Sequence, residues 1–186
     1  MNPSANDIAN AVQRINAENV FVFPNNKNII LAAEQAKALV ENRVIHVIPT
    51  KNIPQGFAAA LSFNPDLSVN ENKANMIHSL DTVVVGQVTY AVRTTKVNGL
   101  DIKEGDVIGL DNKKILAKGN DIGDVAINLI DKLRSGEEII TIYYGQDVKE
   151  DDALKLQELV MEKYPDCDVE IHYGGQPIYY YYIALE

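Results

Sequence analysis

The sequence is poor in the residues that disulfides, metal sites and membrane segments require. It has one cysteine, Cys167, which cannot form an internal bridge, and three histidines without the paired spacing of metal ligands, His46, His78 and His172. No apolar run approaches the roughly 20 residues that span a bilayer, and no signal peptide is recognisable. We therefore expect a cytoplasmic protein with no transmembrane segment and no structural metal.

Basic residues are also scarce. Lys and Arg number 17 against 26 Asp and Glu, which gives the 186-residue chain a formal net charge of -9. Nucleic acids and anionic membranes are bound by clustered Lys and Arg, whereas the lysines here are dispersed. The composition therefore argues against a nucleic-acid partner.

The signatures of nucleotide chemistry are missing as well. Phosphoryl transfer needs Mg²⁺ and a phosphate cradle, and the sequence has no Gly-x-x-x-x-Gly-Lys run. The acidic run Glu150-Asp151-Asp152 suits the positive end of a helix better than a metal site, because consecutive helical residues point in different directions. We predict no catalytic residue, no metal ligand and no cofactor in this chain.

Residues 1–82 alternate helical and strand patterns. We predict helices at 5–17, 29–40, 57–61 and 70–80, and strands at 20–23 and 44–48. The inward face of the second helix is predicted to consist of Ala32, Ala36, Leu39 and Val40, and a turn at Pro54-Gln55-Gly56 precedes the third helix. Alternation of this kind predicts a mostly parallel sheet covered by helices.

Residues 83–186 have a different pattern. Val88, Tyr90 and Val92 alternate with Thr89, Ala91 and Arg93 at the period of a strand. Turn signals at Asn98-Gly99 and Asp111-Asn112 predict hairpins. Two helices are expected, at 122–133 and from about 150 to Pro165, with strands at 139–144, 169–173 and 178–185. The expected inward stripe of the first helix is Ile122, Val125, Ala126, Leu129, Ile130 and Leu133, and that of the second is Ala153, Leu156 and Val160. The sequence thus predicts a two-lobed α/β protein whose second lobe has a mixed sheet with hairpins and two helices.

Two loops of the first lobe repeat each other. Asn26-Lys27-Asn28 and Thr50-Lys51-Asn52 each follow a predicted parallel strand and end in the same Lys-Asn-Ile sequence. Ligands of open parallel sheets bind beyond the carboxyl ends of the strands, and lysines beside helix amino termini suit a phosphate or carboxylate. Helix capping alone also explains Asn28 and Asn52, and exposed lysines are ordinary in loops. Both interpretations stay open.

Further candidates lie in the second lobe. Arg93 is predicted to share a strand face with Thr89 and Ala91, where an arginine is either paired structurally or held for a partner carboxylate. In an extended segment Tyr179 and Tyr181 face away from Tyr180 and Tyr182, so we expect at least one pair in the core. The other pair is either exposed at an interface, for which tyrosine is well suited, or structural as well, and both interpretations stay open.

Five short motifs occur in an order and spacing that resemble a known family. They are Asn2-Pro3-Ser4, Phe23-Pro24-Asn25-Asn26-Lys27-Asn28, Pro49-Thr50-Lys51-Asn52-Ile53-Pro54-Gln55-Gly56, Gly86-Gln87-Val88-Thr89-Tyr90-Ala91-Val92-Arg93 and Tyr173-Gly174-Gly175-Gln176-Pro177. Together they resemble the C-terminal domain of the bacterial fatty acid kinase A subunit, of the dihydroxyacetone kinase-like family. In that family an ATP-binding domain and a middle domain precede this region.

The resemblance implies a function for the parent protein. The complete enzyme would transfer the γ-phosphate of ATP to a fatty acid held by a separate DegV-like carrier, with ATP and Mg²⁺ bound by the absent kinase domain. This chain would be a non-catalytic docking and regulatory domain that contacts the carrier and the kinase domain of the same parent chain. The candidate contact residues are Asn26, Lys27, Asn28, Thr50, Lys51, Asn52, Arg93, Gln176, Tyr179 and Tyr181. The alternative is a binding module for a small anionic or lipid ligand between the two lobes.

A weaker resemblance links the chain to the DegV-type fatty-acid-binding proteins themselves. The second lobe has the DegV order of a hairpin, a helix, a strand, a helix ending in Tyr164-Pro165 and a further strand. Residues 50–57 resemble the Thr-Ser-rich loop that holds a carboxylate there, with Lys51 in place of a small serine. A DegV-like two-lobed scaffold is implied.

Overall fold

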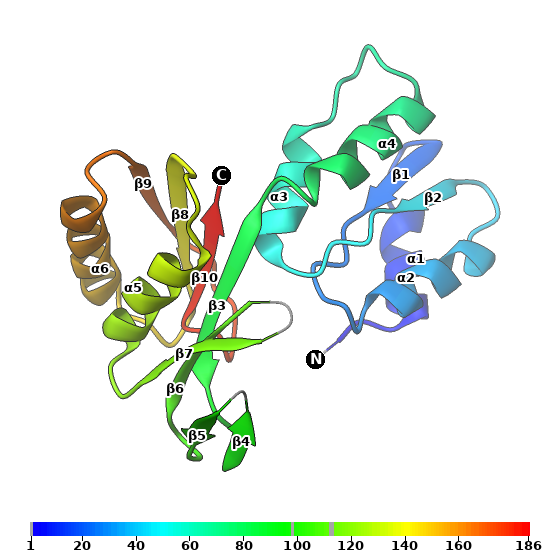
Figure 1. Cartoon of the computed structure of the whole chain (residues 1–186). Coiled ribbons are helices and arrows are strands. Elements are labelled where there is room, and N and C mark those ends of the chain that lie inside the picture. The colour runs from blue at the N-terminus through cyan, green and yellow to red at the C-terminus, as the bar shows by residue number, and fades with distance from the viewer. Residues whose placement is uncertain (1, 98, 112–113) are drawn as a thin grey trace. The chain divides into compact units, whose positions relative to one another are not determined.

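The chain folds into two compact α/β units, with the boundary between Val83 and Val84. The computed structural model describes residues 2–97, 99–111 and 114–186, and Figure 1 shows their helices and strands. Both units combine helices with strands, as the sequence pattern predicts. In these ranges no helix has the length and apolar character needed to cross a membrane.

Unit 1 is built around two parallel strands. Its elements are α1 (Ala5–Gln13), β1 (Asn19–Val22), α2 (Ile30–Ala36), the 3-10 turn η1 (Lys37–Leu39), β2 (Val44–Val47), α3 (Ile53–Leu61) and α4 (Val69–Ser79). The pairing of β1 with β2 is parallel, with Val20 opposite Ile45. The predicted parallel arrangement is confirmed, and two strands form the sheet within the described residues.

The alternating side chains of β1 separate two apolar clusters in unit 1. Val20 and Val22 pack with residues of α1 and α2, whereas Phe21 and Phe23 pack with Ile48 and residues of α3 and α4. Successive strand residues point to opposite faces, so a four-residue strand is sufficient to organise helices on both sides. The carboxyl ends of both strands are thereby held between two small cores.

Helix boundaries in unit 1 correct three predictions. The first helix ends at Gln13, where the Arg14 N–H bonds to Ala11 in a tightened last turn. On the second helix the predicted inward residues Ala36 and Val40 are buried, but Ala33 is buried in place of Ala32. Leu39 is 44% exposed, because the α-helix gives way to a 3-10 turn at Lys37. The third correction concerns residues 54–56, which belong to α3 and do not form a turn.

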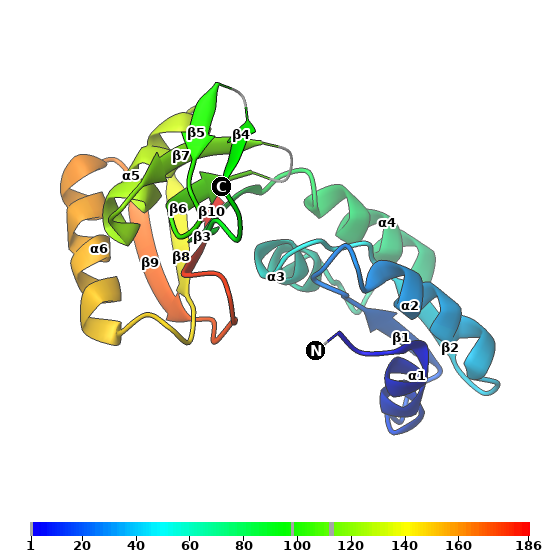
Figure 2. The same cartoon turned by 90° about the horizontal axis from the view of Figure 1, so that it is seen from below.

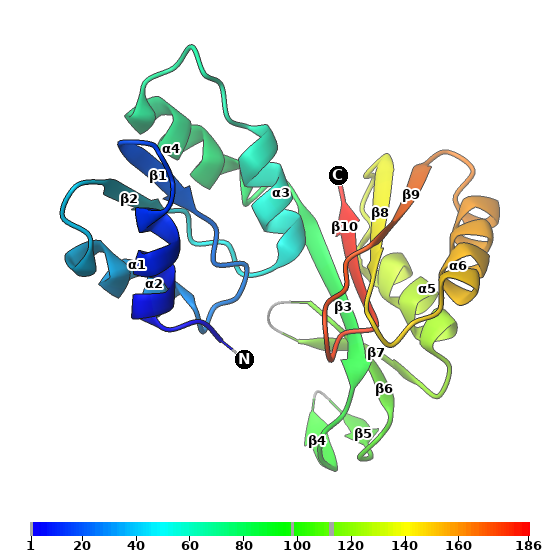
Figure 3. The same ribbon diagram turned by 180° about the vertical axis from the view of Figure 1, so that it is seen from behind.

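Unit 2 contains a six-stranded mixed sheet in the order β7-β6-β3-β10-β8-β9. Its elements are β3 (Val84–Tyr90), β4 (Thr95–Val97), β5 (Leu100–Ile102), β6 (Val107–Leu110), β7 (Ile115–Gly119), α5 (Ile122–Leu133), β8 (Ile139–Tyr144), α6 (Glu150–Lys163), β9 (Asp168–Tyr173) and β10 (Tyr181–Leu185). The β8–β9 pair is parallel and the others are antiparallel, with β10 between β3 and β8 (Figure 3). The two predicted hairpins are present as β4–β5 and β6–β7, although Asn98 and Asn112 of the predicted turns lie outside the described residues.

The helices α5 and α6 cover the same face of this sheet (Figures 1 and 2). Their predicted inward stripes are confirmed, since Val125, Leu129, Leu156 and Val160 are buried in one core with strand residues. The acidic run 150–152 is exposed in the first turn of α6, where carboxylates interact favourably with the helix dipole. The mixed sheet with two helices is therefore as predicted.

The predicted alternation along two strands was wrong. β3 ends at Tyr90, and the neighbouring Val88 and Thr89 are both buried, so the two predicted faces do not differ in burial along the strand. Along β10 the neighbouring Tyr181 and Tyr182 are both buried, so the expected one-sided burial of tyrosine pairs does not occur. Both strands are interior strands of the sheet and are buried on both faces, which removes the period-2 signal.

Candidate functional site

The two Lys-Asn-Ile loops lie side by side beyond the carboxyl ends of β1 and β2. This end of the sheet, formed by residues 25–28 and 50–52, is called the edge below. The strands run parallel with Val22 opposite Val47, so the segments that follow them leave the sheet at the same end. The backbone N–H of Asn25 donates to Oγ1 of Thr50 at 2.9 Å and ties one loop to the other. The structure thus brings together the two segments that the sequence repeat singled out.

The first loop is shaped by two consecutive asparagines. Asn25 has a φ of 54°, in the left-handed region that asparagine tolerates better than most residues. The side-chain oxygen of Asn26 then accepts the N–H of Asn28 at 2.9 Å. The capping role predicted for Asn28 was wrong, because Ile29 occupies the N-cap position of α2 and makes no side-chain bond.

The second loop is fixed by the amino-terminal turn of α3. Asn52 is fully buried and caps the helix by accepting the N–H of Gln55 at 3.0 Å, as predicted. The Gln55 side chain returns to the loop by accepting the N–H of Lys51 at 2.9 Å and donates to the Leu80 carbonyl at 3.2 Å. Pro54 follows without strain because the first turn of a helix needs no N–H from it.

Two polar atoms at this edge are left without partners. Asn25 Oδ1 and Asn52 Nδ2 are buried, and neither forms a hydrogen bond within the described residues. Gly56 makes room for the Asn25 amide, since an ideal Cβ on this glycine would lie 2.2 Å from Asn25 Oδ1. An acceptor and a donor at a helix amino terminus offer hydrogen bonds to a small polar ligand, and leaving them unpaired costs free energy.

Lys27 and Lys51 present their ammonium groups to solvent from these loops. Both residues are exposed, and neither side chain forms an ion pair or hydrogen bond in the part of the chain that the structure describes. Asn28 is exposed beside Lys27, whereas Thr50 and Asn52 lie beneath the surface. The edge therefore has two exposed cations above a rigid, hydrogen-bonded base.

The candidates in unit 2 lie on two segments: Arg93 follows β3, whereas Gln176 and Tyr179, whose carbonyls both approach Gly145, precede Tyr181 at the start of β10. Arg93 is exposed beyond the end of β3, so the strand face predicted for it does not exist. Gln176 is 6% exposed and donates to the Tyr143 carbonyl at 2.9 Å, while its Oε1 atom is buried without a partner among the described residues. Tyr179 is half-buried with its ring centroid 4.9 Å from that of Tyr182, and Tyr181 lines a pocket.

Three residues that shape the edge were not among the predicted site residues. Asn25, Gln55 and Gly56 supply the left-handed turn, the bond back to Lys51 and the space for an amide. Gln55 could have been found from the sequence, because a glutamine three residues after a capping residue such as Asn52 is typical of a helix start. The role of Gly56 depends on a tertiary contact and has no local signature.

Comparison with protein families gives a match over the full length of the chain. A family model for the C-terminal region of proteins like the fatty acid kinase A subunit matches residues 1–186. The chain belongs to this family. Protein YloV of Bacillus subtilis is 44% identical to the chain over 187 residues, and an uncharacterized protein of Staphylococcus aureus (strain USA300) is 40% identical. The chain spans 34% of the length of each of these relatives.

Solved structures show which fold the family shares. DegV, a fatty acid binding protein from Bacillus subtilis, matches with a TM-score of 0.67 at 18% identity, over 98% of this chain and 77% of that protein. The Streptococcus pneumoniae fatty acid kinase (Fak) B3 protein loaded with linoleic acid matches with a TM-score of 0.64 at 16% identity, over 99% and 76%. At such identities the likeness establishes a DegV-like fold for this chain.

Proposed function

We propose that this chain is the docking and regulatory domain of a larger fatty acid kinase protein and that its Lys27 and Lys51 loops hold the fatty-acid carrier. The observation that carries the proposal is the Asn25–Thr50 bond of 2.9 Å, which fixes two exposed lysines on one edge of unit 1. Family membership supports the kinase context. ATP and Mg²⁺ would be bound by another part of the parent protein.

Charge favours this edge as a docking surface. The chain carries a net charge of -9, so a site that attracts acidic groups must be a local cluster of unpaired cations. Long-range attraction between such a cluster and carboxylates of a partner increases the association rate and weakens as salt is added. A carrier that docks here would present an acidic patch.

The test is a titration calorimetry experiment with a lipid-loaded DegV-like carrier and the double variant Lys27→Glu/Lys51→Glu. Reversing two contacts is expected to lower affinity by about 2 kcal/mol or more, close to 30-fold, because attraction is replaced by repulsion. Each exposed substitution should change the free energy of unfolding by no more than about 0.5 kcal/mol.

A matched control has the same charge change elsewhere. Lys103 and Lys114 are exposed lysines of unit 2, and Lys103→Glu/Lys114→Glu alters the net charge equally. An equal loss of affinity in both double variants would show that only the overall charge of the chain matters, and it would contradict docking of the carrier at the Lys27 and Lys51 loops. Unchanged affinity in the first variant would have the same consequence.

A second candidate function is a binding module for a small anionic or lipid ligand. The unpaired donor Asn52 Nδ2 favours it, as does the DegV-like fold. Asn52→Asp retains the side-chain oxygen that caps α3 but replaces the unpaired donor by a negative charge. Native mass spectrometry of the purified chain should then show a co-purified acyl chain that Asn52→Asp abolishes. If the wild-type chain carries no bound ligand in the mass spectrum, this second candidate function is contradicted, and the docking proposal is unaffected.

A further inference from the structure

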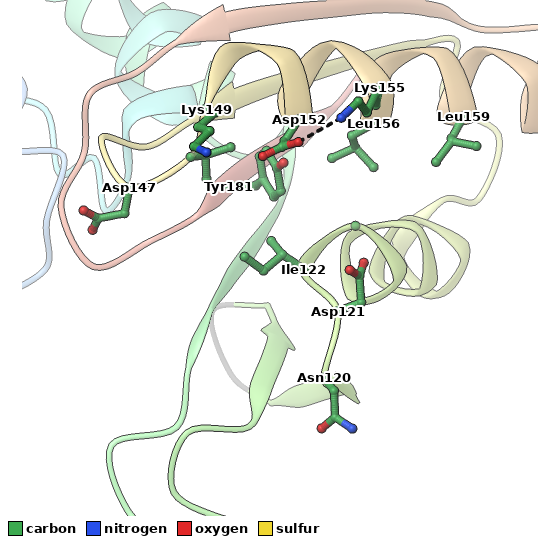
Figure 4. Close-up of a pocket in the computed structure, with 12 residues that line it drawn as sticks. Asn120, Asp121, Ile122, Asp147, Lys149, Asp152, Lys155, Leu156, Leu159 and Tyr181 are labelled. Carbon is green, nitrogen blue, oxygen red and sulfur yellow. Dashed lines mark hydrogen bonds and ion pairs between the residues drawn. The ribbon is translucent and has the colours of Figure 1, made fainter.

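Unit 2 has a pocket that the proposed function does not use. It measures about 500 Å³ and lies between the amino-terminal ends of α5 and α6, over the start of β10. Figure 4 shows its lining, with Leu156 and Leu159 projecting from α6 and Asp121 and Ile122 at the start of α5. Pockets of this size accommodate small organic ligands.

A buried polar group faces this pocket without a partner. Tyr181 is 2% exposed, lines the pocket, and forms no hydrogen bond within the described residues. Burial raises the pKa of its phenol to about 12, and the negative charges of Asp152 and Asp121 add to the shift. The hydroxyl is therefore neutral at physiological pH and has both a proton to donate and lone pairs to accept.

The charges around the pocket favour a cation over an anion. Helix amino termini attract anions, but here the first turns already carry carboxylates, namely Asp121 and Asp124 at α5 and the run 150–152 at α6. The lining itself has three carboxylates, those of Asp121, Asp147 and Asp152, against the two lysines Lys149 and Lys155. The surroundings are therefore negative despite the two helix ends.

One lysine of the lining, Lys155, forms only a weak ion pair with these carboxylates. Lys155 pairs with Asp152 at 3.2 Å, and their side chains are 71% and 57% exposed. Exposed pairs of this kind contribute between about 0 and 1 kcal/mol, so another ammonium group can replace the lysine at Asp152.

The apolar part of the lining decides between kinds of cation. Ile122, Leu156, Leu159 and the Tyr181 ring form a wall that an aqueous metal ion cannot use. No group of three or more His, Cys, Asp or Glu residues is placed to hold a metal within residues 2–97, 99–111 and 114–186. An organic cation with a hydrocarbon stem matches both the carboxylates and the wall.

We propose that this pocket binds a primary alkylammonium group, either of a free aliphatic amine or of a lysine side chain of a partner protein. The ammonium lies among the carboxylates of Asp121 and Asp152 and donates to the Tyr181 oxygen. The stem of four to six methylene groups lies along Ile122, Leu156 and Leu159.

The test is an NMR titration of the isotope-labelled chain with hexylammonium, hexanol and hexanoate. We expect saturable shifts of residues at the starts of α5 and α6, with hexylammonium binding at least tenfold more tightly than hexanoate and more tightly than hexanol. Tighter binding of a short lysine-containing peptide than of hexylammonium identifies a partner lysine as the source, and the reverse order identifies a free amine. Equal affinities for the three hexyl probes, or no saturation, would overturn the proposal.

Two conservative variants localise the binding. Tyr181→Phe removes the unpaired hydroxyl and keeps the buried ring, and it should weaken hexylammonium at least threefold. Tyr182→Phe is the matched control, because Tyr182 is also buried on β10 but is not among the residues of the pocket. If both variants bind as the wild type does, or both lose the same affinity, the assignment to Tyr181 is wrong. Asp152→Asn, at an exposed position that barely affects folding, should weaken hexylammonium as well.

Discussion

Gly145 is the position at which a single added methyl group should disturb unit 2 most. An ideal Cβ there would lie 2.2 Å from the Tyr179 carbonyl oxygen and 2.7 Å from that of Gln176. Both contacts are backbone atoms and cannot rotate away. Two backbone hydrogen bonds join the same two segments. The Gly145 N–H donates to the Tyr180 carbonyl at 2.8 Å, and the Gln146 N–H donates to the Gln176 carbonyl at 3.2 Å. Alanine must therefore displace the segment that leads into β10.

The magnitude follows from separate costs. Forcing a methyl group into a packed site costs about 1–3 kcal/mol. Two strained hydrogen bonds add about 1 kcal/mol each. Alanine also lowers the conformational entropy of the unfolded chain, which offsets no more than about 1 kcal/mol of this loss. We expect Gly145→Ala to lower the free energy of unfolding by about 2–4 kcal/mol, a large part of the roughly 5–15 kcal/mol typical of a domain.

The assay can report on unit 2 alone. The chain has no tryptophan, and all nine tyrosines lie between residues 90 and 182, so tyrosine fluorescence during urea unfolding follows this unit. Gly123→Ala is the control, because its Cβ would meet only the Asp121 carboxylate oxygen, at 3.2 Å, and its helical position favours alanine. The control should change stability by less than about 1 kcal/mol. A Gly145→Ala chain equally close to wild type would refute the steric argument.

Three further predictions concern other contacts. Thr50→Val removes the acceptor of the Asn25 N–H while keeping the side-chain shape, and it should lower the protection of that amide in hydrogen exchange by about 1–3 kcal/mol. Asp131→Asn should lower the free energy of unfolding by about 1–2 kcal/mol at neutral pH, because Asp131 accepts the Tyr164 hydroxyl and pairs with Lys163. Burial raises the pKa of Asp131, but these two partners outweigh it and the pKa is lowered. The contribution of Asp131 is therefore complete above the ordinary pKa near 4 and is lost as the pH falls through the lowered pKa, so the difference in urea unfolding between the variant and wild type should shrink as the pH is lowered below about 4. Finally, phosphate-release assays on the purified chain should show no ATP hydrolysis, and activity that co-purifies with it would contradict the docking role.

The sequence predicts much of the fold because most of its elements carry strong local signals. The α5 stripe through Val125 and Leu129 and the acidic start of α6 follow from helical period and dipole alone. The two-lobed arrangement follows from the change of pattern near residue 83. The pairs β4–β5 and β6–β7 are short hairpins whose turns have recognisable sequences, so their pairing was predictable as well.

The interior strands and the candidate edge were less accessible to prediction. β3 and β10 are neighbours in the middle of the sheet and are buried on both faces, so alternation does not identify the buried tyrosines. Arg93 lies beyond Tyr90, where β3 ends, and so has no strand face at all. At the candidate edge the repeat located the loops correctly, but the roles within them depend on contacts between distant residues. Asn25 meets Thr50 across 25 positions and meets Gly56 through space, which no local pattern records.

The position of β10 also affects how the protein is made. β10 follows β3 by almost a hundred residues, yet it lies between β3 and β8 and pairs with both. Until residues 181–185 leave the ribosome, β3 and β8 each expose an unpaired edge and the sheet is split into two parts. Unit 1 closes its pairing with residue 47 and can fold much earlier. Synthesis therefore passes through a stage at which unit 1 can fold while the split sheet of unit 2 is open to aggregation, and this stage lasts until residues 181–185 have been translated.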